Sequence, residues 1–251
     1  MSLQQLTFNK LKRVLVTASG GTVTYDGDYA VHTFAESGNF TVTYKATSGL
    51  TYDLLCVGGG QYGLEGQTVN SYDTVGGNGG NGGSGGNCKL HSSLSMDAFT
   101  DATVTVGEGN NNYSSFLDGL YTNLGTGSTI AYGGASGGES GNGGPGQAGF
   151  ASSITGSSVV YGSSGGGGGG GGNQYGTLPG SGGAGIFGSG FGGGGGFSGS
   201  DGNAGNQVTS GYGGGGGGGG GAGPDGVLSY SGGMGGFPSQ GVVIVRYRFQ
   251  Q

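Results

Sequence analysis

The 251-residue sequence has no tryptophan, only four prolines and only two cysteines. With so little proline and no strict Gly-X-Y period, a collagen triple helix is excluded. The two cysteines cannot form a disulfide framework, and the absence of a Cys-x-x-Cys spacing argues against a zinc site. Cys56 lies within an apolar strand pattern, so we expect it to be a small buried hydrophobic residue.

Charged side chains are also scarce, at 8% of the residues with a formal net charge of −6. Nucleic-acid binding requires a clustered basic face, which this chain lacks, so no nucleic-acid partner is expected. Arg246 and Arg248 alternate with apolar residues near the end of the chain. This alternation predicts that both arginines share the solvated face of a strand.

No apolar run approaches the roughly 20 residues that a membrane-spanning helix needs, so no membrane insertion is expected. Residues 1–12 lack both an apolar segment and a small-residue cleavage site, and we therefore expect no signal peptide. These two absences predict a protein that is made in the cytoplasm and is not exported by a standard signal.

Residues that carry enzyme chemistry are sparse. The two histidines, His32 and His91, lie in different contexts, one in a strand pattern and one after an expected turn at Cys88 and Lys89. Gly58-Gly59-Gly60 follows an apolar strand, as in a dinucleotide fingerprint, but no helical pattern comes after it and no Gly-Lys-Ser/Thr occurs. We expect no catalytic constellation, no cofactor, no metal site and therefore no enzyme.

What the chain has in abundance is glycine. Almost all of its 74 glycines lie in residues 58–240, with unbroken runs at 165–172, 192–196 and 213–221. Glycine has no side chain to bury, so any order in this region must come from backbone hydrogen bonds. In 76–87 a small polar residue recurs at every third position (Asn78, Asn81, Ser84, Asn87).

Three residues per turn is the polyproline-II period, which places those polar side chains on one edge of a helix. Such a helix has no internal hydrogen bonds, so its backbone groups must pair with neighbouring helices. The sequence therefore predicts a bundle of packed polyglycine-II helices, in which the unbroken glycine runs are surrounded on every side.

The flanking sequence predicts β-structure. Residues 22–25, 29–34, 40–44 and 50–57 read as short strands separated by turn residues, which indicates a small antiparallel unit. Val242 to Val245 is a continuous apolar run, as in a strand buried on both faces, and we predict that it pairs with Asp53 to Val57.

The predicted fold class is thus mostly β plus polyglycine-II. The predicted domains are an N-terminal β attachment module at residues 1–50 and a glycine-rich polyglycine-II domain at residues 51–251. The second domain is opened by a strand at 51–57 and closed by a strand at 241–249.

Four motifs occur in a characteristic order: YDLLCVGGG at 52–60, TVTVGEG at 103–109, SSFLDG at 114–119 and GVVIVRY at 241–247. This order resembles the glycine-rich domain of bacteriophage tail-fibre and tail-tip proteins, and the chain is similar to the tip adhesins of T-even-like long tail fibres. The resemblance implies a virion protein whose loops between glycine helices contact a bacterial outer-surface protein or glycan. It also implies that residues 1–57 dock on another virion protein of the fibre, tail or capsid.

Large apolar side chains interrupt the last glycine blocks. Exposed clusters of this kind mark recognition surfaces, although the same residues could instead plug the ends of the bundle. The candidate receptor-contact residues are Tyr175, Leu178, Phe187, Phe191, Phe197, Tyr212, Tyr230, Met234 and Phe237.

Three functions fit these features. The first is a phage adhesin associated with the tail fibre, and the second is a non-catalytic structural or decoration protein of the virion. The third is an ice-binding protein that uses the Asn and Ser edge of 78–87, although a single short row argues against it.

Overall fold

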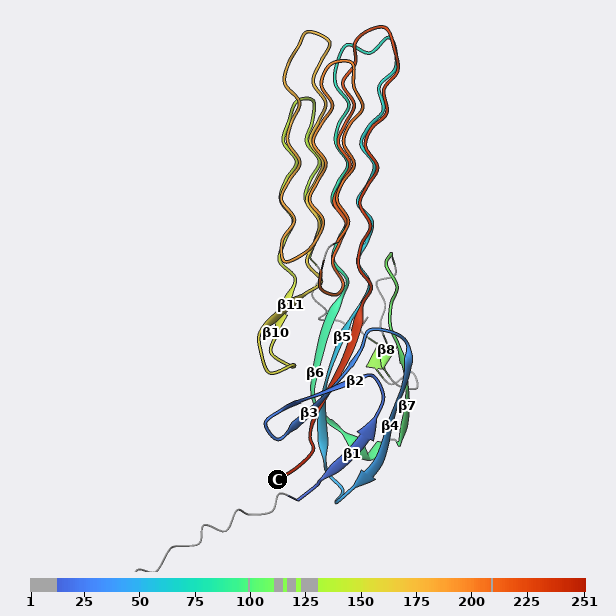
Figure 1. Cartoon of the computed structure of the whole chain (residues 1–251), viewed down its shortest axis with the longest axis vertical. Helices are drawn as coiled ribbons and strands as arrows, with labels where there is room; N and C mark the ends of the chain where they lie inside the picture. Colours follow the sequence, from blue (N-terminus) through green and yellow to red (C-terminus); the bar gives the residue numbers. More distant parts are fainter. Residues whose placement is uncertain (1–12, 99, 111–114, 117–120, 123–130, 209) are drawn as a thin grey trace, which may run out of the picture.

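A computed structural model shows a β base from which a long bundle of extended segments projects (Figure 1). It describes residues 13–98, 100–110, 115–116, 121–122, 131–208 and 210–251. The strands are β1 Val16–Ser19, β2 Thr22–Asp26, β3 Tyr29–Phe34, β4 Gly38–Lys45, β5 Thr51–Val57, β6 Cys88–Ser95, β7 Asp101–Thr105, β8 Ser115–Phe116, β9 Tyr121–Thr122, β10 Phe150–Ser152, β11 Val159–Tyr161 and β12 Val242–Arg248. The protein is therefore mostly β.

Two antiparallel sheets form the base. One has the strand order β2-β3-β12-β5-β6 and the other β1-β4-β7-β8-β9, while β10 and β11 form a separate hairpin. A core cluster joins the two sheets, with Phe40 and Val104 from one of them and Leu54 and Val243 from the other, all fully buried. This core provides the apolar anchor that a glycine bundle cannot provide for itself.

Strand β12 lies at the centre of its sheet, between β3 and β5. Val242 to Tyr247 pair in antiparallel register with Val57 to Tyr52. Val243 and Val245 face the core between the sheets, whereas Val242 and Ile244 pack with Ile154 and Tyr161 beside the β10–β11 hairpin. The predicted burial on both faces and the predicted pairing are confirmed, so both ends of the glycine-rich region meet at the base.

The glycine-rich residues form extended segments that lie side by side. Gly77, Gly80, Gly83 and Gly86 donate in turn to the carbonyl oxygens of Ala222, Gly219, Gly216 and Gly213. In the same segment, residues 79, 82 and 85 donate to a different neighbour, 131–137. The bonding partner thus repeats every three residues, and bonds leave each segment in several directions instead of in one sheet plane.

Two of the unbroken glycine runs, 165–172 and 213–221, form the centre of the bundle and are buried throughout. Backbone bonds connect 165–172 to segments 76–87, 131–140, 141–147, 180–183, 190–196 and 213–221. The expectation of complete enclosure is wrong for 192–196, in which Gly192 and Gly194 are half-exposed. That run lies at the edge of the bundle, where no segment among the described residues covers its outer side.

The small polar residues of 76–87 follow the predicted edge for most of its length. Asn78 and Asn81 are exposed and Ser84 is half-exposed, but Asn87 is buried where the segment enters β6. The packed helices expected from the sequence are not seen as helices. Within the described ranges the one helix is the short 3₁₀ turn η1, Met96–Ala98.

The predicted strands at 22–25, 29–34, 40–44, 50–57 and 241–249 all appear with small changes at their ends. Strand β6 is a correction, because a turn was expected at Cys88 and Lys89. The division at residue 51 stays a prediction. Strands β3 and β5, on either side of it, both pair with β12 in one sheet. Of the motif at 114–119 only residues 115 and 116 are described, and residues 1–12 of the expected attachment module also lie outside the described ranges.

Candidate recognition surface at the distal end

The extended segments reverse direction at the end of the bundle farthest from the sheets (Figure 1). Residue 58 follows β5 directly and residue 87 leads directly into β6, so the turn between these two segments lies at the far end. The same reasoning applies to each later pair of segments. We call this end the distal face, and it consists of residues 70–75, 138–141, 173–178, 197–201 and 224–230.

The nine candidate contact residues do not form one site. Tyr175, Leu178, Phe197 and Tyr230 belong to the distal face. Phe187, Phe191 and Tyr212 lie at or beside turns at the opposite end of the bundle, near the β base, while Met234 and Phe237 lie on its flank. Phe237 packs there against Tyr62, with ring centroids 5.3 Å apart.

The distal face carries more apolar surface than the sequence indicated. Tyr175 is 80% exposed and Leu178 74%, but Tyr72 at 93% and Val227 at 71% are as prominent and were not among the candidates. Tyr72 follows the first glycine block and not one of the last, so it was not considered. The signal in the sequence that indicates Tyr72 is the short glycine-poor interval around it, in which the chain has to reverse its direction between two glycine-rich segments.

Asp225 organises the last distal turn. Its Oδ1 accepts hydrogen bonds of 2.8 Å from the N–H groups of both Val227 and Leu228, and its Oδ2 accepts one of 2.8 Å from the Tyr230 hydroxyl. These bonds, first that from the Leu228 amide, hold the pKa of Asp225 below its usual value. The Asp225 carboxylate is therefore charged in the folded protein at neutral pH.

Other side chains brace the distal turns, either within one turn or between neighbouring turns. Asn173 Oδ1 accepts from the Tyr175 amide at 3.0 Å, and the hydroxyls of Ser140 and Thr177 lie 3.0 Å apart. The Ser198 hydroxyl donates to the carbonyl oxygen of Pro224 at 3.0 Å. The exposed apolar side chains thus extend from a braced platform.

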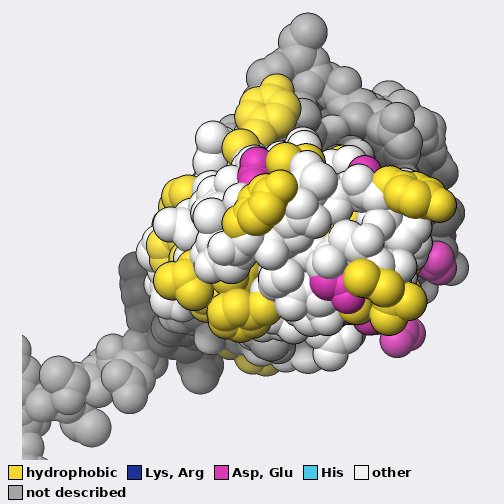
Figure 2. Space-filling model, turned by 90° about the horizontal axis from the view of Figure 1, so that it is seen from above, with side chains coloured by type: hydrophobic (Ala, Val, Ile, Leu, Met, Phe, Trp, Pro, Cys, Tyr) yellow, Lys and Arg dark blue, Asp and Glu magenta, His cyan; other side chains and the backbone are white. Residues whose placement is uncertain are grey.

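Seen from the distal end, the molecule presents hydrophobic and acidic side chains, with no lysine or arginine among the coloured atoms (Figure 2). On the flank just below, a polar hollow of roughly 380 Å³ is lined by Asp73, Glu139, Gln67 and Asn78 together with Val69, Val75, Gly76 and Gly77. Within the described part of the chain, no three His, Cys, Asp or Glu side chains gather closely enough to hold a metal ion.

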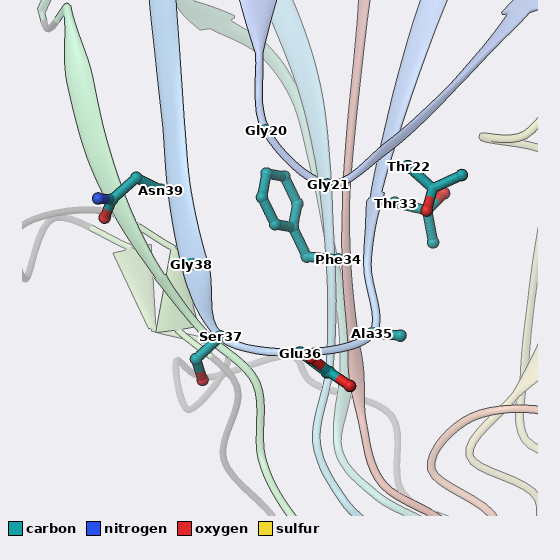
Figure 3. Close-up of a pocket in the computed structure, with 10 residues that line it drawn as sticks. All are labelled: Gly20, Gly21, Thr22, Thr33, Phe34, Ala35, Glu36, Ser37, Gly38 and Asn39. Atoms are coloured by element: carbon teal, nitrogen blue, oxygen red, sulfur yellow. The ribbon is translucent and has the colours of Figure 1, made fainter.

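A second hollow, of about 530 Å³, lies at the base between the Gly20–Gly21 turn and the loop 35–39 (Figure 3). The Phe34 ring points toward the glycines, and Gly20 has a φ of +115° with no room for a Cβ beside the Asn39 carbonyl oxygen. Glu36 is the single ionisable residue in its lining. This lining offers no nucleophile paired with a base.

His32 has a structural role in the base. It is fully buried, with Nδ1 2.7 Å from the Gly20 carbonyl oxygen and Nε2 3.0 Å from the Tyr247 hydroxyl. A carbonyl oxygen only accepts, so Nδ1–H donates to it, and in the neutral ring that burial favours, Nε2 accepts from the hydroxyl. Burial lowers the pKa of His32, and it raises the pKa of the Cys56 and Cys88 thiols to about 12. Cys56 is indeed a small buried hydrophobic residue.

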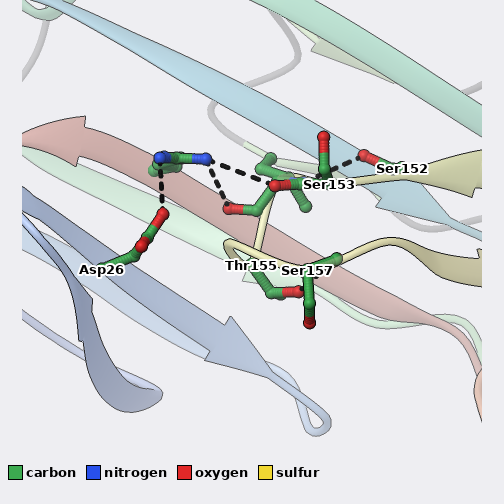
Figure 4. A network of polar contacts seen from close by, with 7 residues as sticks. Asp26, Ser152, Ser153, Thr155 and Ser157 are labelled. Atoms are coloured by element: carbon green, nitrogen blue, oxygen red, sulfur yellow. Dashed lines mark hydrogen bonds and ion pairs between the residues drawn. The ribbon is translucent and has the colours of Figure 1, made fainter.

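Arg246 is a correction to the sequence analysis, which placed it on a solvated face. Its guanidinium forms an ion pair of 2.8 Å with Asp26 of β2 and donates to the Ser153 carbonyl oxygen at 3.3 Å (Figure 4). It also lies over the Tyr29 ring, 4.3 Å from the centroid. Arg246 therefore fastens the β10–β11 hairpin to the sheet below the bundle, whereas Arg248 is about half-exposed as expected.

The profile of a protein family described as "Glycine-rich domain" matches residues 34–248. The chain belongs to this glycine-rich domain family. The match begins at the end of β3 and ends with β12, so the domain includes the closing strand and most of the base as well as the bundle. No curated protein matches the chain. Within the described residues, no helix is long and apolar enough to cross a membrane.

Proposed function

We propose that the extended segments of the bundle adopt the polyglycine-II conformation. The three-residue repeat of the bonding partners supports this, because three residues per turn is the period of that helix. Bonds that leave one segment in several directions fit it too, since strands of a sheet bond only within one plane. An experimental structure tests the proposal. Backbone angles near φ −75° and ψ +145° are expected, and a φ of about −140°, as in antiparallel strands, would contradict it.

We further propose that the protein is a non-catalytic bacteriophage adhesin, part of or associated with the tail fibre. In this proposal the distal face binds a receptor on the bacterial cell surface. The observation that carries the proposal is the row of exposed apolar side chains, Tyr72, Tyr175 and Leu178 among them, on turns farthest from the base. Such side chains are unfavourable in water and gain free energy when a partner buries them.

The architecture suits this role because the base and the distal face lie at opposite ends. Arg13 and Gln251 exchange backbone hydrogen bonds of 2.9 and 3.0 Å at the base. Docking of the base on another virion protein of the fibre, tail or capsid through residues 1–57 would leave the distal turns free. Bracing of those turns supports recognition, because a preorganised surface loses less conformational entropy on binding.

Competition with the phage that encodes the chain tests this proposal. Purified protein is incubated with host cells before the phage is added, and free phage is counted over time. An adhesin occupies the receptors, so adsorption should slow in proportion to the protein added. A mature virion should also contain the chain by mass spectrometry, and its absence from the virion would contradict the proposal.

A structural or decoration protein of the virion is the second candidate. Phe187 and Phe191 favour it, since both are more than half exposed near the base, where a neighbouring virion protein could cover them. In that case the chain would be present in the virion but would leave adsorption unchanged. The two assays together therefore separate the two functions.

A further inference from the structure

Among the described residues, lysine and arginine occur in the base alone, whereas acidic side chains occur both in the base and on the bundle. The lysines and arginines of the chain are Lys10, Lys12, Arg13, Lys45, Lys89, Arg246 and Arg248. Lys45 belongs to β4, Lys89 to β6 and the last two arginines to β12, all in the base. The sequence between Lys89 and Arg246, like that between Lys45 and Lys89, has no lysine or arginine, so the bundle carries neither.

The carboxylates of the bundle, in contrast, lie almost all on the distal face. The acidic residues of the bundle are Glu65, Asp73, Glu139, Asp201 and Asp225, and all but Glu65 lie in the distal turns. Asp73 accepts a hydrogen bond of 2.6 Å from the Asn70 amide, and Asp201 one of 2.7 Å from the Ser231 amide. Each is held in place through one oxygen, which leaves the other oxygen for a partner.

Exposed aromatic rings lie in the same turns as these carboxylates. Tyr72 precedes Asp73 in one turn, and Phe197 and Asp201 belong to another. The faces of aromatic rings attract cations, and carboxylates form charge-assisted hydrogen bonds with ammonium and guanidinium groups. A surface that combines both, without a basic side chain of its own, complements lysine and arginine.

We propose that the partner of the distal face is a polypeptide surface that presents lysine and arginine side chains. This inference rests on the proposed adhesin function and names the chemistry of its receptor. Charge complementarity decides between the candidate partners, because the phosphates and carboxylates of an anionic cell-surface polysaccharide would be repelled by Asp73, Glu139, Asp201 and Asp225. Complementary charge also accelerates association and makes it sensitive to salt.

Neutralisation of the distal carboxylates tests the inference. The distal variant is Asp73→Asn, Glu139→Gln, Asp201→Asn and Asp225→Asn, in which each amide keeps one oxygen to accept backbone hydrogen bonds. At position 225 that oxygen retains the bonds from the Val227 and Leu228 amides, and the amide nitrogen donates to the Tyr230 hydroxyl where Oδ2 accepted from it. A matched control removes the same number of charges at exposed positions of the base: Glu36→Gln, Asp97→Asn, Asp101→Asn and Glu108→Gln. Thermal unfolding establishes that both variants remain folded.

Association of the labelled full chain with intact host cells is measured at 50, 150 and 500 mM NaCl. The distal variant should associate about tenfold more slowly than the unmodified chain at low salt and should lose most of the salt dependence. The base control should behave like the unmodified chain. Equal or faster association of the distal variant would overturn the inference while leaving the adhesin function intact.

Treatment of the cells identifies the source of the partner chemistry. Protease treatment, or acetylation of surface amines together with phenylglyoxal modification of arginines, should abolish binding, and periodate oxidation of glycans should not. Binding that survives protease but is lost after periodate would overturn the inference in favour of a glycan. If the unmodified chain does not bind untreated cells at all, the adhesin function itself is contradicted. That result is distinct from loss of binding after protease and from loss of binding after periodate.

Discussion

Gly195 lies so close to Gly170 that a Cβ on Gly195 would overlap the carbonyl oxygen of Gly170. Its neighbour Gly194 has the opposite environment, because the nearest atom to a Cβ there is Asn203 Nδ2 at 3.5 Å, an ordinary contact distance. Two adjacent glycines in one unbroken run thus differ in whether a methyl group fits. The difference arises because one points into the bundle and the other to its surface.

Alanine at these two positions should therefore give opposite results. Gly195→Ala forces segments apart and should lower the free energy of unfolding by about 1–3 kcal/mol, as overpacking does elsewhere. Gly194→Ala should be neutral or stabilising by up to about 1 kcal/mol, because alanine restricts the unfolded chain. Denaturant unfolding of both variants measures this, and equal destabilisation would show that the packing of the bundle is described wrongly.

The Arg246 anchor provides a second test. Arg246→Gln removes the ion pair to Asp26 and the bonds to the β10–β11 hairpin, and should lower the free energy of unfolding by about 1–2 kcal/mol. Arg248→Gln is the matched control on the same strand. Arg248 is half-exposed and 3.7 Å from Asp28, so its loss should change stability by less than about 1 kcal/mol.

Hydrogen exchange shows where the Arg246 change acts. Amides of residues 150–161 should exchange faster in Arg246→Gln and remain unchanged in Arg248→Gln. Uniform acceleration over the whole chain would mean that the arginine supports the entire sheet and has no specific link to the hairpin.

The buried histidine predicts how stability depends on pH. Burial lowers the pKa of His32 in the folded state below the value of 6.5 in the unfolded chain. As the pH falls through 6.5, the unfolded state binds a proton at this histidine more readily than the folded state does. The free energy of unfolding should therefore fall as the pH is lowered from 7 to 5. His91 has a pKa lowered by burial and by Lys89, and it acts in the same direction.

His32→Gln removes the more deeply buried of these two histidines, and with it that histidine's contribution to the pH dependence of stability. Denaturant unfolding at pH 7, 6 and 5 should show a shallower pH dependence in the variant, with the remainder due to His91. If the variant keeps the full pH dependence of the free energy of unfolding, the titrating group responsible for it lies elsewhere in the protein.

The sequence predicted the closing strand well, because an apolar run such as Val242 to Val245 has few other structures available to it. It predicted the enclosure of 165–172 and 213–221 because long glycine runs tolerate close neighbours on every side. It failed at 192–196, since glycine content does not show how many segments surround a run. Arg246 was misplaced for a related reason: its partners Asp26 and Ser153 are distant in sequence and nothing local indicates them.

The candidate surface was predicted only in part. Exposed aromatic residues were expected in the inserts, but the sequence could not show that Tyr175 and Phe187 lie at opposite ends of the bundle. That assignment depends on the direction of each segment, which follows from the hydrogen-bond register. Tyr72 was not predicted because it lies before the long glycine runs whose interruptions supplied the candidates.

This separation of the two ends supplies the most direct test of the proposed recognition surface. Binding to intact host cells is compared for two folded variants, a distal one with Tyr175→Ser, Leu178→Ser and Phe197→Ser and a proximal one with Phe187→Ser and Phe191→Ser. The account predicts that the distal variant loses at least about tenfold in affinity, as expected when central apolar contacts are removed, and that the proximal variant binds like the unmodified chain. Binding that is lost in the proximal variant and kept in the distal one would contradict it.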